Sequence, residues 1–136
     1  MVTKMPKTVI ANALITPDGT ILQSYHRHDY KTYTDKNGEM YMIDGGVDYM
    51  RSIDNEEKPQ YVTVTMEDPH SPRRKWFHWG TRGVNGDQPL TWKPLKDLDT
   101  EHIKAILDTQ HHIGEHLIEL FEDELHYRHD VLGENI

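Results

Sequence analysis

Residues 24–51 read SYHRHDYKTYTDKNGEMYMIDGGVDYMR, and this stretch decides the first half of the fold. Apolar and polar residues alternate over Tyr30–Thr34 and again over Glu39–Ile43, as in strands with one buried face. Asp35–Gly38 separates the two segments and has turn chemistry, because its glycine readily takes a positive φ. We therefore expect a β-hairpin here, followed after two glycines by a short helix over Val47–Ile53.

The segments on either side also predict antiparallel strands. Lys7–Leu14 is apolar and β-branched, and Thr20–Tyr25 resumes an extended pattern after the turn residues Pro17–Gly19, which predicts a first hairpin. Tyr61–Met66 alternates strictly, so we expect a strand with one buried face. A polar linker, Asn55–Pro59, precedes that strand.

The main helices are expected near the C-terminus. Arg73–Trp79 is rich in aromatic residues and predicts a strand, which a glycine-rich turn joins to Leu90–Lys93 in a third hairpin. Asp99 is a good N-cap for a helix that continues through Gln110, and a second helix is expected over His112–Arg128. The apolar stripe of this second helix comprises Ile113, Leu117, Leu120, Phe121 and Leu125.

These elements predict an α+β fold, in which an antiparallel sheet of about five to seven strands carries two C-terminal helices on one face. A chain of 136 residues fits a single domain, 1–136, with one shared core. The sequence is also compatible with two sub-modules, the first hairpins at 7–55 and the later strands with the helical pair at 60–130.

The composition narrows the classes of partner. The formal charge is -8 at pH 7 and the pI is about 5.6, so the chain lacks the basic field that general nucleic-acid binding needs. It has no cysteine, which excludes disulfides, thiolate metal sites and cysteine nucleophiles. No apolar run approaches the roughly 20 residues of a membrane helix, and the first residues lack the apolar segment of a signal peptide. We therefore expect a cytoplasmic protein with no membrane partner.

The densest polar chemistry lies in the SYHRHDY and DGGVDYMR segments, and three interpretations of it stay open. In a strand, His26 and His28 project from one face, which suits a metal site completed by Asp44. Alternatively, Asp29 orients a histidine, and an arginine pairs with an aspartate to tie two turns together. In the third interpretation, the arginines, imidazoles and glycine amides bind a phosphate or nucleotide, with a tyrosine stacked on the base. The candidate ligand-binding residues are His26, Arg27, His28, Asp29, Tyr30, Asp44, Asp48 and Arg51.

A second cluster interleaves basic and aromatic residues. Bases stack on aromatic rings while cations hold phosphate, so the pattern is typical of nucleotide or single-strand binding, and it also suits contact with a protein partner. In the alternative interpretation, the rings face the core and the arginines are solvated at a sheet edge. The residues concerned are Arg73, Arg74, Trp76, Trp79 and Arg82.

Two histidines four positions apart, His112 and His116, have the spacing of metal ligands on a helix. The intervening glutamate of the metalloprotease motif is absent from this pair. Surface histidines on an acidic helix are therefore the default interpretation.

The SYHRHDY segment at Ser24–Tyr30, followed by DGGVDYMR at Asp44–Arg51, resembles small uncharacterised proteins of tailed bacteriophages. WGTRG at Trp79–Gly83, NGDQPL at Asn85–Leu90 and the segment His102–Gln110 also look like parts of such proteins. The resemblance implies an accessory phage protein in the cytoplasm of the infected host cell. Such proteins commonly inhibit a host enzyme or defence system, or sequester a signalling nucleotide.

Binding is therefore favoured over catalysis, and no catalytic residue is assigned. We expect an accessory protein that inhibits or modulates a host defence protein, with a protein that binds and sequesters a nucleotide or cyclic nucleotide as the alternative. The third hypothesis is a metal-dependent hydrolase, in which His26, His28 and Asp44 hold the ion and activate water. No cofactor is expected apart from that divalent metal. The partner would be a host protein or a small nucleotide, nucleic acid is disfavoured, and a homo-oligomer is left open.

Overall fold

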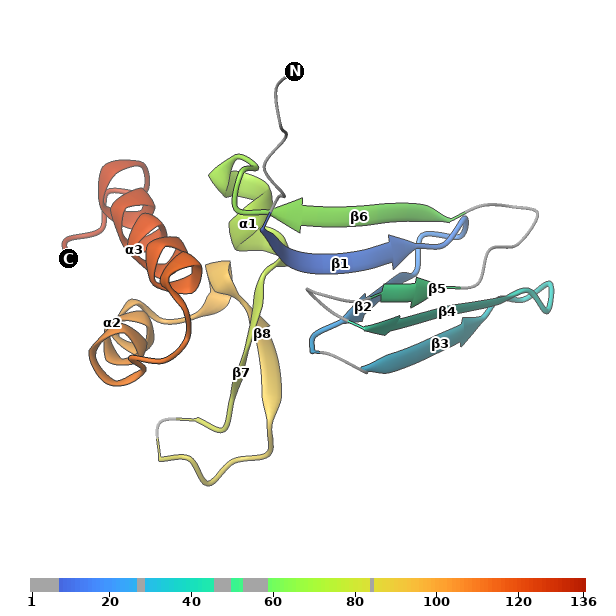
Figure 1. Cartoon of the computed structure of the whole chain (residues 1–136), viewed down its shortest axis with the longest axis horizontal. Coiled ribbons are helices and arrows are strands. Elements are labelled where there is room, and N and C mark those ends of the chain that lie inside the picture. The colour runs from blue at the N-terminus through green and yellow to red at the C-terminus, as the bar shows by residue number, and fades with distance from the viewer. Residues whose placement is uncertain (1–7, 27–28, 46–49, 53–58, 84) are drawn as a thin grey trace, which may run out of the picture. The chain divides into compact units, whose positions relative to one another are not determined.

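The computed structural model describes residues 8–26, 29–45, 50–52, 59–83 and 85–136. The fold is α+β with antiparallel strands, as the sequence predicts, but the strands form three separate sheets (Figure 1). In chain order the elements are β1 (Val9–Ile15), β2 (Ile21–Ser24), β3 (Tyr30–Thr34), β4 (Met40–Gly45), β5 (Met50–Ser52), β6 (Gln60–Thr65), α1 (His70–Trp76), β7 (His78–Thr81), β8 (Thr91–Pro94), the 3₁₀ turn η1 (Leu95–Asp97), α2 (Thr100–Thr109) and α3 (Glu115–Asp130).

The chain divides into two compact units, Met1–Thr65 and Met66–Ile136, which we call unit 1 and unit 2. Strand β6 pairs with β1 and so belongs to unit 1. The expectation of one core shared by the whole chain stays a prediction.

Unit 1 consists of two three-stranded antiparallel sheets, with strand orders β2-β1-β6 and β3-β4-β5. Both hairpins expected in this part of the chain are confirmed, with β1 paired to β2 and β3 paired to β4. Leu14 and Leu22 are register partners in the first hairpin, and they pack with Tyr41 and Ile43 of β4. Tyr41 and Ile43 share one face of β4 because side chains alternate along a strand. The alternation read from the sequence therefore places the core of unit 1.

The short helix expected over Val47–Ile53 is wrong where the structure describes it. Met50–Ser52 forms strand β5, which pairs antiparallel with β4. A helix of two turns at most is marginal in isolation, because nucleation costs more than so few hydrogen bonds return. Pairing with the free edge of β4 satisfies the same backbone groups without that cost. The rest of the expected helix lies outside the described residues.

In its described residues unit 2 consists of helices α1, α2 and α3, the turn η1 and the β7–β8 hairpin, and Phe121 of α3 is fully buried. Phe77 and Trp79 meet Phe121 edge to face, with ring centroids 6.0 and 5.3 Å away. The expected third hairpin is confirmed as β7 paired with β8. The other fully or almost fully buried apolar residues of unit 2 are Leu95, Leu98, Ile103, Ile106 and Leu120.

The strand expected over Arg73–Trp79 is wrong in its first half, because His70–Trp76 forms helix α1. Pro72 lies in the first turn, where the missing N–H has no intrahelical partner to lose. Two arginines and a lysine follow in the last turn, and these residues favour helix and complement the negative end of its dipole. The aromatic strand therefore begins only at His78.

Helix α3 begins at Glu115 rather than at His112. Gly114 precedes it with a φ of +90°, a conformation that ends continuous helix and that side-chain-bearing residues rarely adopt. His112 lies in the turn before Gly114, whereas His116 lies on the helix. The interpretation of these two histidines as a same-face helical pair is therefore wrong. The helix expected from Asp99 is confirmed, with Asp99 at the N-cap and Gln110 at the C-cap.

In the part of the chain that the structure describes, none of the helices combines the length and the apolar character needed to cross a membrane.

Truncating Leu14 should destabilise the protein by about 2–5 kcal/mol, because the side chain is fully buried in the core cluster of unit 1. Urea denaturation of Leu14→Ala against the parent chain measures this cost. Ile21→Ala is the matched control in the same hairpin, since Ile21 is 54% exposed and its loss should change stability by about 0.5 kcal/mol or less. Equal losses in the two variants would contradict the placement of the core.

Candidate functional site

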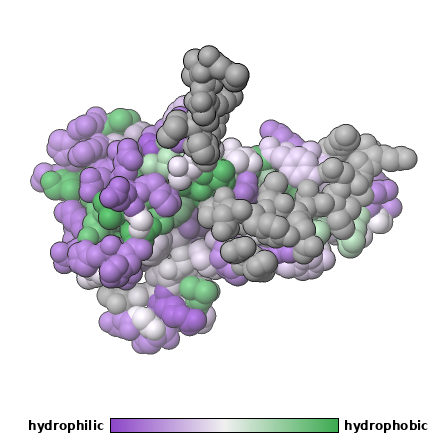
Figure 2. Space-filling model, viewed as in Figure 1, coloured by the Kyte–Doolittle hydropathy of each residue, from purple (hydrophilic) through white to green (hydrophobic). Residues whose placement is uncertain are grey.

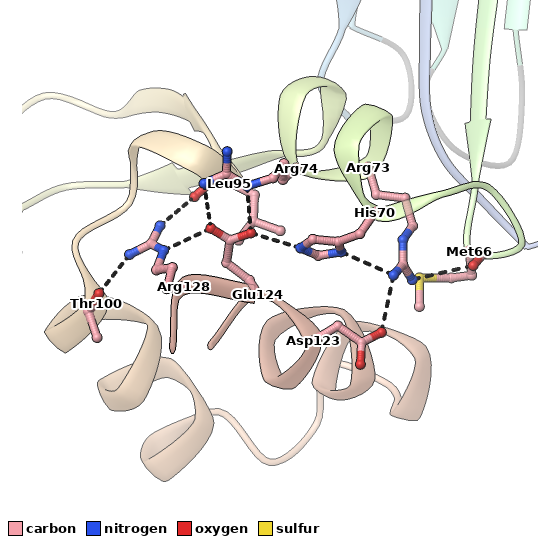
Figure 3. A network of polar contacts seen from close by, with 9 residues as sticks. All are labelled: Met66, His70, Arg73, Arg74, Leu95, Thr100, Asp123, Glu124 and Arg128. Carbon is pink, nitrogen blue, oxygen red and sulfur yellow. Dashed lines mark hydrogen bonds and ion pairs between the residues drawn. The ribbon is translucent and has the colours of Figure 1, made fainter. Parts of the chain in front are cut away.

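A single buried carboxylate, that of Glu124 on α3, connects three of its neighbours in unit 2 (Figure 3). Its Oε1 accepts hydrogen bonds from His70 Nε2 at 2.8 Å and from Arg74 Nε at 2.9 Å. Its Oε2 accepts from Arg74 Nη2 at 2.9 Å and from Arg128 Nε at 2.8 Å. The bidentate pairing with Arg74 and the zero exposure of Glu124 make this a strong, geometrically defined ion pair.

A second layer of contacts extends from His70. Arg73 Nη2 lies 3.0 Å from His70 Nδ1 and 3.2 Å from Asp123 Oδ2, and Arg73 Nη1 donates to the carbonyl of Met66. A guanidinium can only donate, so His70 Nδ1 must accept and the proton of a neutral ring must sit on Nε2, facing Glu124. Arg74 also lies over the ring of Tyr127, 4.5 Å from its centroid. We call these residues the Glu124 network: His70, Arg73, Arg74, Asp123, Glu124 and Arg128.

Arg128 carries the network to the start of α2. Its Nη2 donates to the carbonyl of Leu95 at 3.1 Å, directly after β8, and its Nη1 donates to Thr100 Oγ1 at 2.9 Å. Leu95 N–H in turn donates to the carbonyl of Phe77 at 2.8 Å. The side chain held by Glu124 therefore fixes both ends of the turn that connects the β7–β8 hairpin to α2.

Two opposing effects act on the pKa of Glu124. Burial raises it, because a charged carboxylate is poorly solvated inside the protein. The hydrogen bonds from His70, Arg74 and Arg128 outweigh burial and lower the pKa to about 2. Glu124 is therefore ionised in the folded state over the whole physiological range.

A groove of about 660 Å³ lies between the β7–β8 hairpin and helix α2, and we call it the unit 2 groove. The hairpin contributes two cross-strand pairs that share one face, Trp79 with Lys93 and Thr81 with Thr91. The helix contributes residues three or four positions apart, which also share one face: His102, Ala105, Ile106 and Thr109. The volume lies in the range of ligand pockets, about 300–1,000 Å³.

The surface that lines the groove is mainly apolar, although many of the lining residues also carry a polar group, and its two carboxylates belong to Asp99 and Glu101, where α2 begins. Asp99 occupies the N-cap of α2, yet its side chain makes no capping hydrogen bond. Glu101 forms an exposed ion pair with Lys104 at 3.5 Å, which is worth little in water. Lys93 lies on the hairpin wall. The lining thus offers a ligand the carboxylates of Asp99 and Glu101 and the ammonium of Lys93, with Lys104 beside Glu101.

The structure brings three of the predicted ligand-binding residues into one row. Tyr30 pairs in register with Asp44, and Asp44 with Arg51, across strands β3, β4 and β5. Asp44 is buried, whereas Tyr30 is 59% exposed. Arg27, His28 and Asp48 lie outside the described residues, so the full constellation stays a prediction.

Asp29 caps the loop before β3 rather than standing free for a ligand. Its Oδ2 accepts a hydrogen bond from the backbone N–H of Tyr25 at 2.9 Å. His26 Nε2 and Lys31 Nζ lie 3.9 and 3.8 Å from its two oxygens. A separation of 3.9 Å exceeds that of a hydrogen bond, so the interpretation in which Asp29 orients a histidine stays a prediction. Among the residues described, no group of three or more His, Asp or Glu could hold a metal ion, and the predicted ligand His28 is not among them.

The second predicted cluster separates in the fold. Arg73 is buried and Arg74 largely so, and both belong to the Glu124 network instead of an exposed sheet edge. Trp79 lines the unit 2 groove, whereas Trp76 on α1 has Lys75 over its ring at 5.3 Å. Arg82 is exposed just after β7.

Sequence reasoning missed the Glu124 network, although a signal for it was present. Glu124 and Arg128 are four positions apart, with the orientation that favours an ion pair on a helix. They also extend the apolar stripe that runs through Leu120 and Phe121. Charged residues on a buried stripe are rarely buried unless paired, so their position already indicated a partner. The unit 2 groove gave no such signal, because its walls come from segments separated in the sequence.

No protein-family model, no curated protein and no solved structure matches this chain. The groove and the network therefore stand on their geometry alone.

Replacing Glu124 by glutamine should lower the free energy of unfolding by about 3–5 kcal/mol, because it leaves buried cations without their counter-charge. Chemical denaturation measures the loss. Glu122→Gln makes the same change two positions away on α3, at an exposed side chain, and should change the stability by about 0.5 kcal/mol or less. A Glu124→Gln protein as stable as the parent would show that the network contributes nothing.

The acid stability of the protein should depend on Glu124. Its pKa is lowered on folding from an ordinary value of 4.5 to about 2, so its contribution to stability is complete above about pH 4.5 and is lost as the pH falls towards 2. Stability curves measured by thermal melting across this window should fall more steeply for the parent than for Glu124→Gln. Curves of equal slope would contradict the lowered pKa.

Proposed function

We propose that this protein is a phage accessory protein that acts by binding a host protein, which it inhibits or modulates in the cytoplasm of the infected cell. The observation that carries the proposal is the unit 2 groove, with its mainly apolar lining open to a ligand. The resemblance of the SYHRHDY and DGGVDYMR segments to phage proteins supplies the biological setting. The binding mode would be that of an apolar segment laid into a groove between a helix and a sheet.

The charges near the groove favour a protein partner over a nucleotide. Counted from the sequence, unit 2 has 14 acidic and 8 basic residues, a formal charge of -6 with histidine neutral. A phosphate group in the groove would meet the carboxylates of Asp99 and Glu101 as well as Lys93, and Lys104 is already paired with Glu101. Like charges at close range oppose binding, so a nucleotide is disfavoured there.

A photoreactive amino acid at Ala105 tests this proposal in bacteria that express the chain. Ala105 is exposed on α2 and lines the groove, so the probe should form a discrete covalent adduct with a host protein. The same probe at His126, which is exposed on α3 outside the groove lining, should not form that adduct.

The outcome that contradicts the proposal is equally definite. Identical adduct patterns from positions 105 and 126, or none from either, would remove the groove as a protein-binding site. Thermal stabilisation of the purified chain by a nucleotide, without any adduct at Ala105, would instead support the nucleotide-sequestering hypothesis.

A further inference from the structure

We infer that the unit 2 groove recognises a basic amphipathic peptide segment, in which a large apolar side chain is flanked by arginine or lysine. This inference rests on the proposed function, which it deepens by stating the chemistry of the partner. Two independent features of unit 2 carry it: the apolar middle of the groove and the distribution of charge around it.

The apolar anchor follows from the residues in the middle of the groove. Trp79 on the hairpin is half-buried and braced by Phe121, 5.3 Å away edge to face, so its ring is held in place before any ligand arrives. Ala105 and Ile106 face it from α2. The small side chain of Ala105 leaves the space that a large apolar side chain can fill. Pockets that exclude water once a partner fills them are where interfaces concentrate their binding energy.

The basic flank follows from how unit 2 distributes its arginines. Arg73, Arg74 and Arg128 are buried or nearly so, and they are compensated by Glu124 and Asp123. Without these three arginines and two carboxylates, the rest of unit 2 has 12 acidic and 5 basic residues. Its formal charge is therefore -7, compared with -6 for the whole unit. Hydrophilic residues cover most of the viewed surface over α2 and α3 (Figure 2).

Asp99 and Glu101 place negative charge in the groove lining itself. The carboxylate of Asp99 makes no capping hydrogen bond to its own helix, and Glu101 follows two positions later. Helix α2 has 10 residues and is therefore about 15 Å long, so one short segment reaches from the apolar middle of the groove to both carboxylates. An arginine beside the apolar anchor would meet them there, and the surrounding negative field would speed its association.

A random peptide library selected on the full-length chain tests the inference without knowledge of the natural partner. A parallel selection on Ala105→Trp, whose indole fills the groove from an exposed position, removes peptides that bind elsewhere. The control is His126→Trp, at an exposed position outside the groove lining. Peptides that bind His126→Trp but not Ala105→Trp are the groove ligands. We expect them to share an aromatic or large aliphatic residue next to arginine or lysine.

The affinity of one such peptide for charge variants then tests the basic specificity separately from binding in the groove. Asp99→Asn combined with Glu101→Gln should weaken it by roughly tenfold at low salt, and the difference should shrink as salt is raised. The matched pair Glu119→Gln and Glu122→Gln, exposed on α3, should have a much smaller effect.

Groove ligands that are apolar but neutral or acidic would overturn the basic specificity while leaving the binding function in place. Selections that return no sequence dependent on Ala105 would overturn the inference and, if the cross-link at position 105 is also absent, the proposed function with it.

Discussion

The buried carboxylate of Glu124 is the interaction on which unit 2 depends. Removing a carboxylate from water costs several kcal/mol, and only excellent hydrogen bonding offsets that cost. Here the donors are His70 and Arg74 from α1 and Arg128 from α3 itself. Arg128 then reaches the two ends of the turn between β8 and α2. The ion pair between Glu124 and Arg128 therefore holds the turn that connects the two walls of the unit 2 groove, the β7–β8 hairpin and α2.

The same placement of charged residues bears on both the stability of unit 2 and the binding that we propose for it. Arginines that could have made unit 2 attractive to phosphate are instead placed against Glu124 and Asp123, and Arg74 also lies over Tyr127. The acidic residues left on the surface are not compensated in this way. Placing these arginines in the Glu124 network therefore also leaves the surface of unit 2 with an excess of acidic residues. Both the network and this surface favour the basic partner that we propose.

Much of the fold could be predicted from the sequence, because alternation and turn residues act locally. The hairpins around Pro17–Gly19 and Asp35–Gly38 and the N-cap at Asp99 are of this kind. The errors have identifiable causes. Strand β5 is set by pairing with β4, which local propensity does not encode, and aromatic residues near Trp76 outweighed the helix-forming basic run in our interpretation of α1. Gly114 was a readable signal for the start of α3.

The candidate site was less predictable than the fold. The row of Tyr30, Asp44 and Arg51 follows from hairpin register, but its chemistry also depends on residues beyond the described ranges. The pairing of Glu124 with Arg128 could be predicted from their spacing on an apolar stripe, but their partners on α1 could not. A groove formed by residues 79–93 and 99–110 requires the tertiary structure, because no local pattern brings those segments together.

The most direct test of this account is an NMR titration of the full-length chain with a basic amphipathic peptide obtained from the groove-dependent selection. We expect the NMR signals of the indole N–H of Trp79 and of the amides around Ala105 and Ile106 to shift together and to saturate at one stoichiometry. Shifts confined to the row of Tyr30, Asp44 and Arg51 would contradict it and return the functional site to unit 1.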